Sequence, residues 1–249
     1  MKQPNSLVKL MEIYLRVLYA LVLVMILAYI IKKKGYLDDI GVAVSTLMAF
    51  IILIGTDIKW LLIILSFLVL GSLVSRVGCS KKESMRLYQC RRSLKNVVAN
   101  GLVAFLIVVL YMLGILDYNT ALFGYVGAIS AATSDTFSSE LGILSRETPR
   151  LITTFEKVER GTDGGITLWG TVAGLIGSFL IGLLATLLFN NYYLLIVSTL
   201  AGILGNLSDS LSGALFERKG ILNNEHVNFI CTLVGSISAV LMYKLLSLF

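Results

Sequence analysis

Residues 166–190 read ITLWGTVAGLIGSFLIGLLATLLFN, and this stretch decides the class of fold. It contains no charged side chain, and about 20 apolar residues are enough for a helix to cross about 30 Å of hydrocarbon. A helix also satisfies its own backbone hydrogen bonds, as a segment in lipid must. We therefore expect a membrane-spanning α-helix here.

The rest of the chain has the same character. Of its 249 residues, 57% are hydrophobic and 14% are charged, whereas soluble domains are about 25% charged. A soluble fold of this length could not bury so much apolar surface. The net charge of +6 is typical of loops facing the cytoplasm and anionic lipid head groups, so we expect membrane lipids as partners and no nucleic acid.

Apolar stretches predict an all-α integral membrane protein with about eight transmembrane helices in a single bundle. Residues 1–249 are expected to form one polytopic domain, with the first span retained rather than cleaved as a signal peptide. The expected spans are 10–31, 38–56, 58–76, 97–116, 118–137, 166–190, 192–214 and 226–248.

Basic residues fall in alternate loops and predict the orientation. Most of the 21 lysines and arginines either follow the first span directly or lie in, or next to, loops 77–96, 138–165 and 215–225. The positive-inside rule places these loops in the cytoplasm and both termini outside the cell membrane. Because most acidic residues lie on the same side, we expect loops 77–96 and 138–165 to carry part of a site for a cytoplasmic substrate.

The first polar motif is residues 130–142, SAATSDTFSSELG, at the end of the fifth expected span. On a helix, Asp135, Ser138 and Ser139 share a face. An acidic residue close to lipid indicates function, and carboxylates with hydroxyl groups suit Mg²⁺. The alternative is a polar helix end that faces solvent.

The second motif is residues 205–214, GNLSDSLSGA, which repeats the pattern Ser-Asp-(Thr/Ser)-x-Ser. The repeat indicates a parallel duplication or two helix ends that converge on one site; a chance Ser/Asp-rich end is the alternative. If Asp135 and Asp209 face each other, they repel unless a cation lies between them.

The third motif is residues 160–167, RGTDGGIT, directly before the expected span at 166–190. Glycines let a backbone approach a ligand, and the N–H groups of a starting helix can receive a phosphate. The motif lacks the Gly-Lys-(Ser/Thr) of a Walker A loop. A simple turn into a membrane helix is the alternative.

The fourth motif is residues 91–101, RRSLKNVVANG. Asn96 and Asn100 share a helix face, and an asparagine within a span requires a polar partner. Positive-inside anchoring explains most of the basic charge. In the last span, Asn228 is a candidate polar contact for the site, whereas His226, the only histidine, is expected to be interfacial.

These four segments, in this order, resemble the phytyl-phosphate kinase / transmembrane protein 19 family of multi-pass membrane proteins. The matching strings are residues 92–101, 132–142, 160–167 and 206–214, with Asn228 and Gly235 in the last span. The chain differs at Ser208, where a glycine is expected, and at Glu217, where a glutamine is expected. The resemblance implies a kinase that uses a nucleoside triphosphate, often CTP, to convert a prenyl monophosphate into the diphosphate.

The expected site follows from the motifs and the resemblance together. We expect Asp135, Glu140 and Asp209 to be catalytic and to bind Mg²⁺. The residues expected to bind substrate or nucleotide are Arg92, Lys95, Asn96, Asn100, Ser134, Thr136, Ser139, Arg146, Arg160, Gly161, Thr162, Gly164, Asn206, Ser210 and Asn228. The acceptor phosphate is already ionised, so no strong general base is needed.

Two other functions remain open. One is a related enzyme, either a CTP-dependent polyprenol kinase or a lipid cytidylyltransferase. The other is an ion-coupled transporter with Asp135 and Asp209 as cation sites, although transporter sites lie nearer the membrane midplane. A homo-oligomer is compatible with either.

Overall fold

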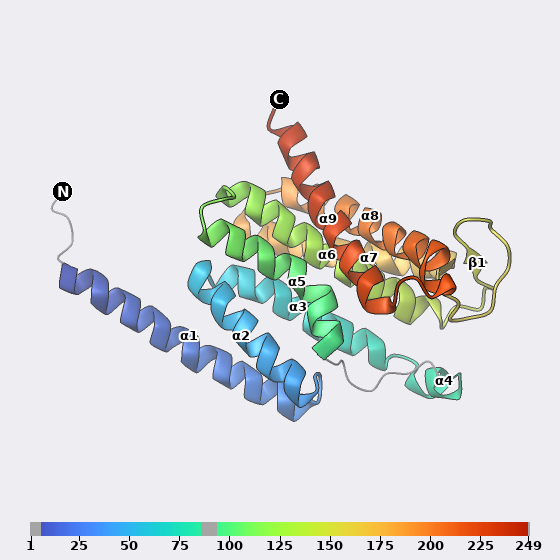
Figure 1. The fold of residues 1–249 in the computed structure, drawn as a ribbon, viewed down its shortest axis with the longest axis horizontal. Helices are drawn as coiled ribbons and strands as arrows, with labels where there is room; N and C mark the ends of the chain where they lie inside the picture. The colour runs from blue at the N-terminus through green and yellow to red at the C-terminus, as the bar shows by residue number, and fades with distance from the viewer. Residues whose placement is uncertain (1–5, 86–93, 249) are drawn as a thin grey trace.

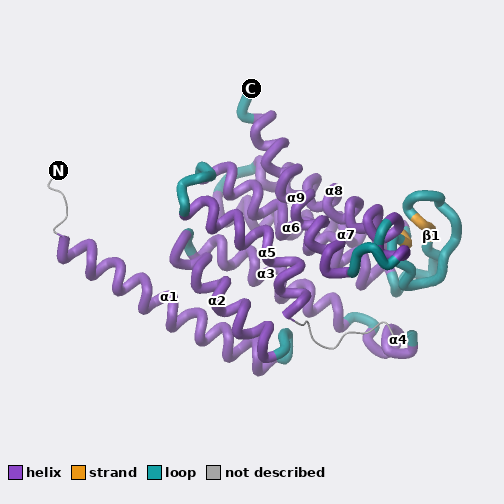
Figure 2. The backbone as a smooth tube through the Cα atoms, viewed as in Figure 1, coloured by secondary structure: helices purple, strands orange, loops and turns teal. Residues whose placement is uncertain are grey.

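The computed structural model describes residues 6–85 and 94–248 of the chain. Within these ranges the fold is a bundle of α-helices (Figures 1 and 2). The long helices are α1 (Ser6–Lys34), α2 (Asp39–Gly55), α3 (Ile58–Arg76), α5 (Leu94–Met112), α6 (Tyr118–Gly142), α7 (Leu168–Phe189), α8 (Tyr193–Leu215) and α9 (Asn224–Leu246). The short elements are α4 (Cys79–Ser84), β1 (Arg150–Leu151), β2 (Gly165–Ile166) and the 3₁₀ turn η1 (Glu217–Lys219).

Helix α6 is the centre of the bundle and packs against α3, α5, α7, α8 and α9. Small residues allow this close packing. A Cβ added at Gly127 of α6 would lie 2.4 Å from the Cβ of Ala239 in α9, and one added at Gly174 of α7 would lie 3.0 Å from the carbonyl oxygen of Ser134. The glycines at 170, 174 and 177 likewise bring α7 close to neighbouring helices, as small residues do in membrane bundles.

Helices α1 and α2 form the edge of the bundle, with α1 running along α2 (Figure 1). Ala20 and Val24 of α1 are buried against Leu53 of α2 and Leu61 of α3. The other faces of α1 carry exposed apolar side chains, including Leu18, Val22 and Met25, as expected of a helix facing lipid.

The expectation of eight spans is wrong when the helices are judged by their length and composition. Six helices in the described ranges are long and apolar enough to cross a membrane: residues 13–34, 58–76, 94–112, 168–189, 193–219 and 224–246. The expected span at 38–56 is the 17-residue helix α2, about 26 Å long against about 30 Å of hydrocarbon.

The expected span at 118–137 is the other difference. Helix α6 has 25 residues, but its mean hydropathy is low because it carries a run of serines, threonines and acidic residues. The helices around α6 cover most of its surface. Most of its side chains therefore do not face lipid and need not be apolar. The helix also continues to Gly142, which places Asp135 inside it rather than at its end.

Loop 138–165 is more ordered than a simple connection. Its first residues extend α6, and β1 pairs antiparallel with β2 so that Arg150 lies opposite Ile166. Figure 2 shows this hairpin as the strand-containing loop at one end of the bundle. Gly164 has a φ of +75°, and an added Cβ would lie 2.5 Å from the backbone nitrogen of Ala214, so this close approach fixes the loop against α8.

Candidate active site

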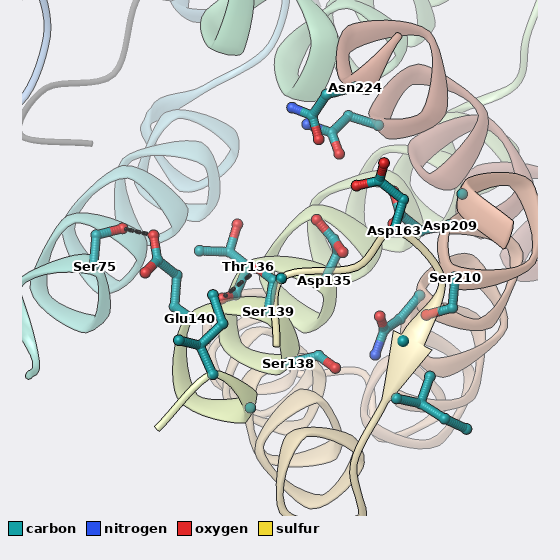
Figure 3. A pocket seen from close by; sticks show the side chains of 18 of the residues that line it. Ser75, Asp135, Thr136, Ser138, Ser139, Glu140, Asp163, Asp209, Ser210 and Asn224 are labelled. Carbon is teal, nitrogen blue, oxygen red and sulfur yellow. Dashed lines mark hydrogen bonds between the residues drawn. The ribbon is translucent and has the colours of Figure 1, made fainter. Parts of the chain in front are cut away.

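A polar cavity of about 330 Å³ lies at the end of the bundle where loop 143–167 folds against α6 and α8. Its lining comes from α3, α5, α6, α8, η1 and the start of α9, together with the turn at residues 35–36 and the loop residues 143, 149 and 160–167. Segments far apart in the sequence therefore meet at one place, and Figure 3 shows their side chains directed toward the cavity.

Four carboxyl groups converge in this cavity. Asp135 comes from α6, Asp209 from α8, Asp163 from the loop and Glu217 from η1. The side chains of Asp135 and Asp209 interact directly, and the charges of Glu217 and Asp163 also act on Asp209. The two Ser-Asp motifs thus converge on one site, which was one of the two explanations for their repeat.

This cluster suits a divalent cation. Oδ2 of Asp209 is buried and has no hydrogen-bond partner, and a buried carboxylate oxygen without a partner is costly. No group of three His, Cys, Asp or Glu side chains in residues 6–85 and 94–248 is arranged to hold a metal ion by itself. Mg²⁺ commonly binds one or two carboxylates and takes its other ligands from water and substrate phosphates, so Asp135 and Asp209 fit it.

Glu140 has a different environment from the other acids. Its Oε2 accepts a 2.6 Å hydrogen bond from Nζ of Lys82. Its Oε1 accepts a 2.7 Å bond from the hydroxyl of Ser75, which Figure 3 shows. The Lys82 side chain is 0% exposed, and its Nζ also donates to the carbonyl of Ser75. Glu140 lines the cavity, but both of its carboxylate oxygens accept hydrogen bonds that connect α6 to α3 and α4.

Most of the other expected binding residues also line the cavity. These are Asn96, Asn100, Thr136, Ser139, Arg160, Gly161, Thr162, Gly164, Asn206, Ser210 and Asn228. Asp135, Ser138 and Ser139 share a face of α6 as predicted, and all three line the cavity.

Three expected residues are absent from the lining. Lys95 is exposed and lies 3.8 Å from the carboxylate of Glu225. Arg146 is exposed, and Ser134 is buried behind the cavity against Gly174. Arg92 lies outside the described residues.

Arg160 holds the loop in place. Its guanidinium donates to the carbonyls of Ile143 (2.9 Å), Ser145 and Glu147 (3.3 Å). An arginine expected to bind phosphate therefore uses several of its N–H donors within the protein, and it borders the cavity while shaping its rim.

The N-terminus of α7 is already capped. The Thr167 hydroxyl accepts from the N–H of Gly170 at 3.0 Å, and Oε2 of Glu147 accepts from the N–H of Leu168 at 3.0 Å. These partners occupy N–H groups that the glycine-rich motif was expected to offer to a phosphate. The motif therefore contributes to the cavity chiefly through residues 160–164.

Comparison with known proteins gives the family. A model described as "Integral membrane protein DUF92" matches residues 22–236. The chain belongs to the DUF92 family. It is therefore an integral, multi-pass membrane protein.

Three relatives of this DUF92 protein come from an archaeon and a plant. An uncharacterized membrane protein of Methanocaldococcus jannaschii is 55% identical over 94% of this chain and 97% of its own length. Protein VTE6, chloroplastic, of Arabidopsis thaliana is 33% identical over 74% of this chain and 58% of its own length. Protein PGR of the same plant is 29% identical over 89% of this chain and 94% of its own length. No solved structure matches the chain.

The DUF92 structure adds residues that the sequence analysis did not place in the site. Asp163 and Glu217 join the acid cluster, and Tyr36 and Arg76 also line the cavity. Burial raises the pKa of Asp163 above its ordinary value of 3.8, and Arg218 opposes this shift. Asp163 lies inside the recognised glycine-rich motif and could have been included, but the position of Arg76 depends on the packing of α3.

Proposed function

We propose that this DUF92 protein is a membrane kinase that transfers a phosphoryl group from a nucleoside triphosphate, CTP by family resemblance, to a prenyl monophosphate. The observation that carries the proposal is the meeting of Asp135 and Asp209 in a polar cavity, with Oδ2 of Asp209 buried and unpartnered. The motif resemblance to phytyl-phosphate kinases favours a prenyl phosphate as acceptor.

Phosphoryl transfer depends on positioning and on neutralisation of charge more than on covalent chemistry. When Mg²⁺ is bound, it supplies positive charge to the triphosphate oxygens. Asp135 and Asp209 would hold this cation, and the charges of Asp163 and Glu217 add to the negative field at Asp209. Without a cation, the same carboxylates would repel both substrates.

The reaction needs no proton acceptor. An ionised oxygen of the prenyl phosphate forms a bond to the γ-phosphorus, and the bond from that phosphorus to the β,γ-bridging oxygen breaks. The nucleoside diphosphate leaves with the bonding electrons. The amides of Asn206 and Asn228 and the hydroxyls of Thr136 and Ser210 line the cavity and orient the phosphates by hydrogen bonds.

Basic residues gather around the cavity end of the bundle, with Arg76, Lys82, Arg160 and Arg218 all near it. By the positive-inside rule this end faces the cytoplasm, where nucleotide is available. Lipid phosphate from the membrane and soluble nucleotide can then reach the same polar edge.

The test is purified protein with Mg²⁺, labelled CTP and a panel of prenyl alcohols and monophosphates. The expected result is label transfer to a monophosphate with release of CDP; release of pyrophosphate indicates a cytidylyltransferase instead. Asp135→Asn and Asp209→Asn should each lower kcat by at least about 100-fold, as expected when a group that holds charge in the transition state is lost.

The matched control is Asp39→Asn, because this aspartate is exposed and pairs with the exposed Lys32. It should keep wild-type turnover. If no acceptor in the panel is labelled by wild-type protein, or if both active-site variants turn over normally, the proposed function is wrong.

A further inference from the structure

A second cavity, apolar and about 80 Å³ in volume, lies between α1, α2, α3 and α5. Leu27 of α1, Ala49 of α2 and Leu65 of α3 are among its lining residues, and hardly any of its lining is polar. A cavity of about 150 Å³ can hold benzene. The apolar cavity is about half that size, so it fits a short stretch of hydrocarbon chain.

The apolar cavity adjoins the acidic cavity along α3. Leu68, Ser72 and Arg76 are spaced four residues apart and therefore share one face of this helix. Leu68 lines the apolar cavity, whereas Ser72 and Arg76 line the acidic one. The face thus changes over about 12 Å from hydrocarbon to hydroxyl to cation.

The same change occurs at two other places. At the start of α5, Asn100 lines the acidic cavity and the next residue, Gly101, lines the apolar one. In the turn after α1, Tyr36 lines the acidic cavity and Leu37 lines the apolar one. Three separate segments therefore meet both cavities, so the two are neighbours in space.

Arg76 is held at this boundary. Its guanidinium lies 5.0 Å from the centre of the Tyr36 ring and donates a 3.0 Å hydrogen bond to the carbonyl of Lys34. A guanidinium has five N–H donors, so this bond leaves donors that can receive a phosphate. Its charge also complements a substrate that must approach four carboxylates.

A chain leaving the apolar cavity meets the edge of the bundle. Helix α1 packs along α2 with most of its surface exposed, and it contributes Val24 and Leu27 to the cavity (Figure 1). Hydrocarbon that exceeds the cavity would therefore continue on the lipid-facing side of the bundle that α1 forms.

From this geometry we infer that α3 carries the acceptor subsite: the isoprenoid chain begins in the apolar cavity, and its phosphate lies at Arg76, facing Asp135 and Asp209. The inference rests on the proposed function and deepens it by placing the lipid on the α3 side. The nucleotide then occupies the side formed by α8 and the loop at 160–164.

The first test fills the cavity. Ala49→Phe should raise KM for a twenty-carbon prenyl monophosphate about 10-fold and leave KM for CTP unchanged, because several buried methylene contacts are lost. Leu47→Phe is the matched control, since Leu47 is on the same helix and 60% exposed. Arg76→Gln should also raise KM for the lipid, with partial rescue by Arg76→Lys. Equal KM values for wild type, Ala49→Phe and Arg76→Gln would overturn the inference.

The second test needs no turnover. A prenyl monophosphate with a diazirine on its first isoprene unit is photolysed with wild-type protein in nanodiscs, and labelled peptides are mapped. Label on α2, α3 or α5 that is lost in Ala49→Phe supports the subsite, and label on α7–α9 overturns it. If wild-type protein phosphorylates no acceptor but is labelled at these helices, the kinase proposal fails while lipid binding at α3 stands.

Discussion

Replacing Lys82 by methionine should strongly destabilise the protein. Nζ of Lys82 lies 2.6 Å from Oε2 of Glu140, and the lysine side chain is 0% exposed whereas the glutamate side chain is 25% exposed. Methionine keeps an apolar stem of similar length but leaves Glu140 without its cation. The Ser75 and Val74 carbonyls lose a donor as well.

The size of the effect follows from burial. Removing one partner of a buried ion pair costs about 3–5 kcal/mol, and partial exposure of Glu140 lets water compensate in part. We therefore expect Lys82→Met to lower the free energy of unfolding by about 3 kcal/mol. Adding Glu140→Gln removes the stranded charge, so the double variant should recover about 1–2 kcal/mol of that loss.

The measurement is reversible unfolding in mixed detergent micelles, followed by circular dichroism. Lys81→Met is the control, because Lys81 is the exposed neighbour whose Nζ bonds the Leu144 carbonyl, and it should change stability by no more than about 0.5 kcal/mol. A loss below about 1 kcal/mol for Lys82→Met, or effects that add in the double variant, would refute the structural role given to this pair.

Three further predictions concern the site. Gly164→Ala should lower the free energy of unfolding by about 2–3 kcal/mol and expose loop 143–167 to protease, because the added Cβ would collide with Ala214. The control is Gly220→Ala, which has a similar φ of +69° but open space around it, and it should lower the free energy of unfolding by only about 1 kcal/mol. Asp209→Asn should abolish phosphoryl transfer. It should nevertheless raise the midpoint of thermal unfolding measured without divalent cation, because it relieves the repulsion between residue 209 and Asp135. An unchanged midpoint would contradict this explanation of the acid cluster. Burial raises the pKa of Asp163, so its ionised form destabilises the fold above pH 3.8. The Asp163→Asn variant should therefore be more stable than wild type at pH 7 and equally stable below pH 3.8. A gain in stability that persists below pH 3.8 would point to another cause.

Much of the site could be predicted from local patterns. The repeated Ser-Asp motif indicated, as one of two explanations, helix ends that converge on one site, and Asp135 and Asp209 do meet in the cavity. Helical spacing placed Asp135, Ser138 and Ser139 on one face, and all three line it. These predictions succeed because the helix period alone fixes which side chains share a face.

The roles of charged side chains could not be predicted in this way. Arg160 bonds the carbonyls of the loop, and Glu140 bonds Lys82, although each was expected to contact substrate or metal. A charged residue binds whichever partner folding brings nearest, and that partner can be tens of residues away. The span count failed for a different reason: α2 has only 17 residues, and polar side chains lower the mean hydropathy of α6.

By itself, then, the sequence determined that the chain is a helical membrane protein, because uncharged stretches such as 166–190 have no other stable arrangement in lipid. It also identified candidate site residues, because a polar group in such a protein is costly unless it has a partner or a function. Only the tertiary structure decided that α6 lies at the centre, and that Asp163, Glu217 and Arg76 join the cavity. Those placements depend on close contacts between distant segments, such as Gly164 against Ala214, and such contacts leave no periodic trace in the sequence.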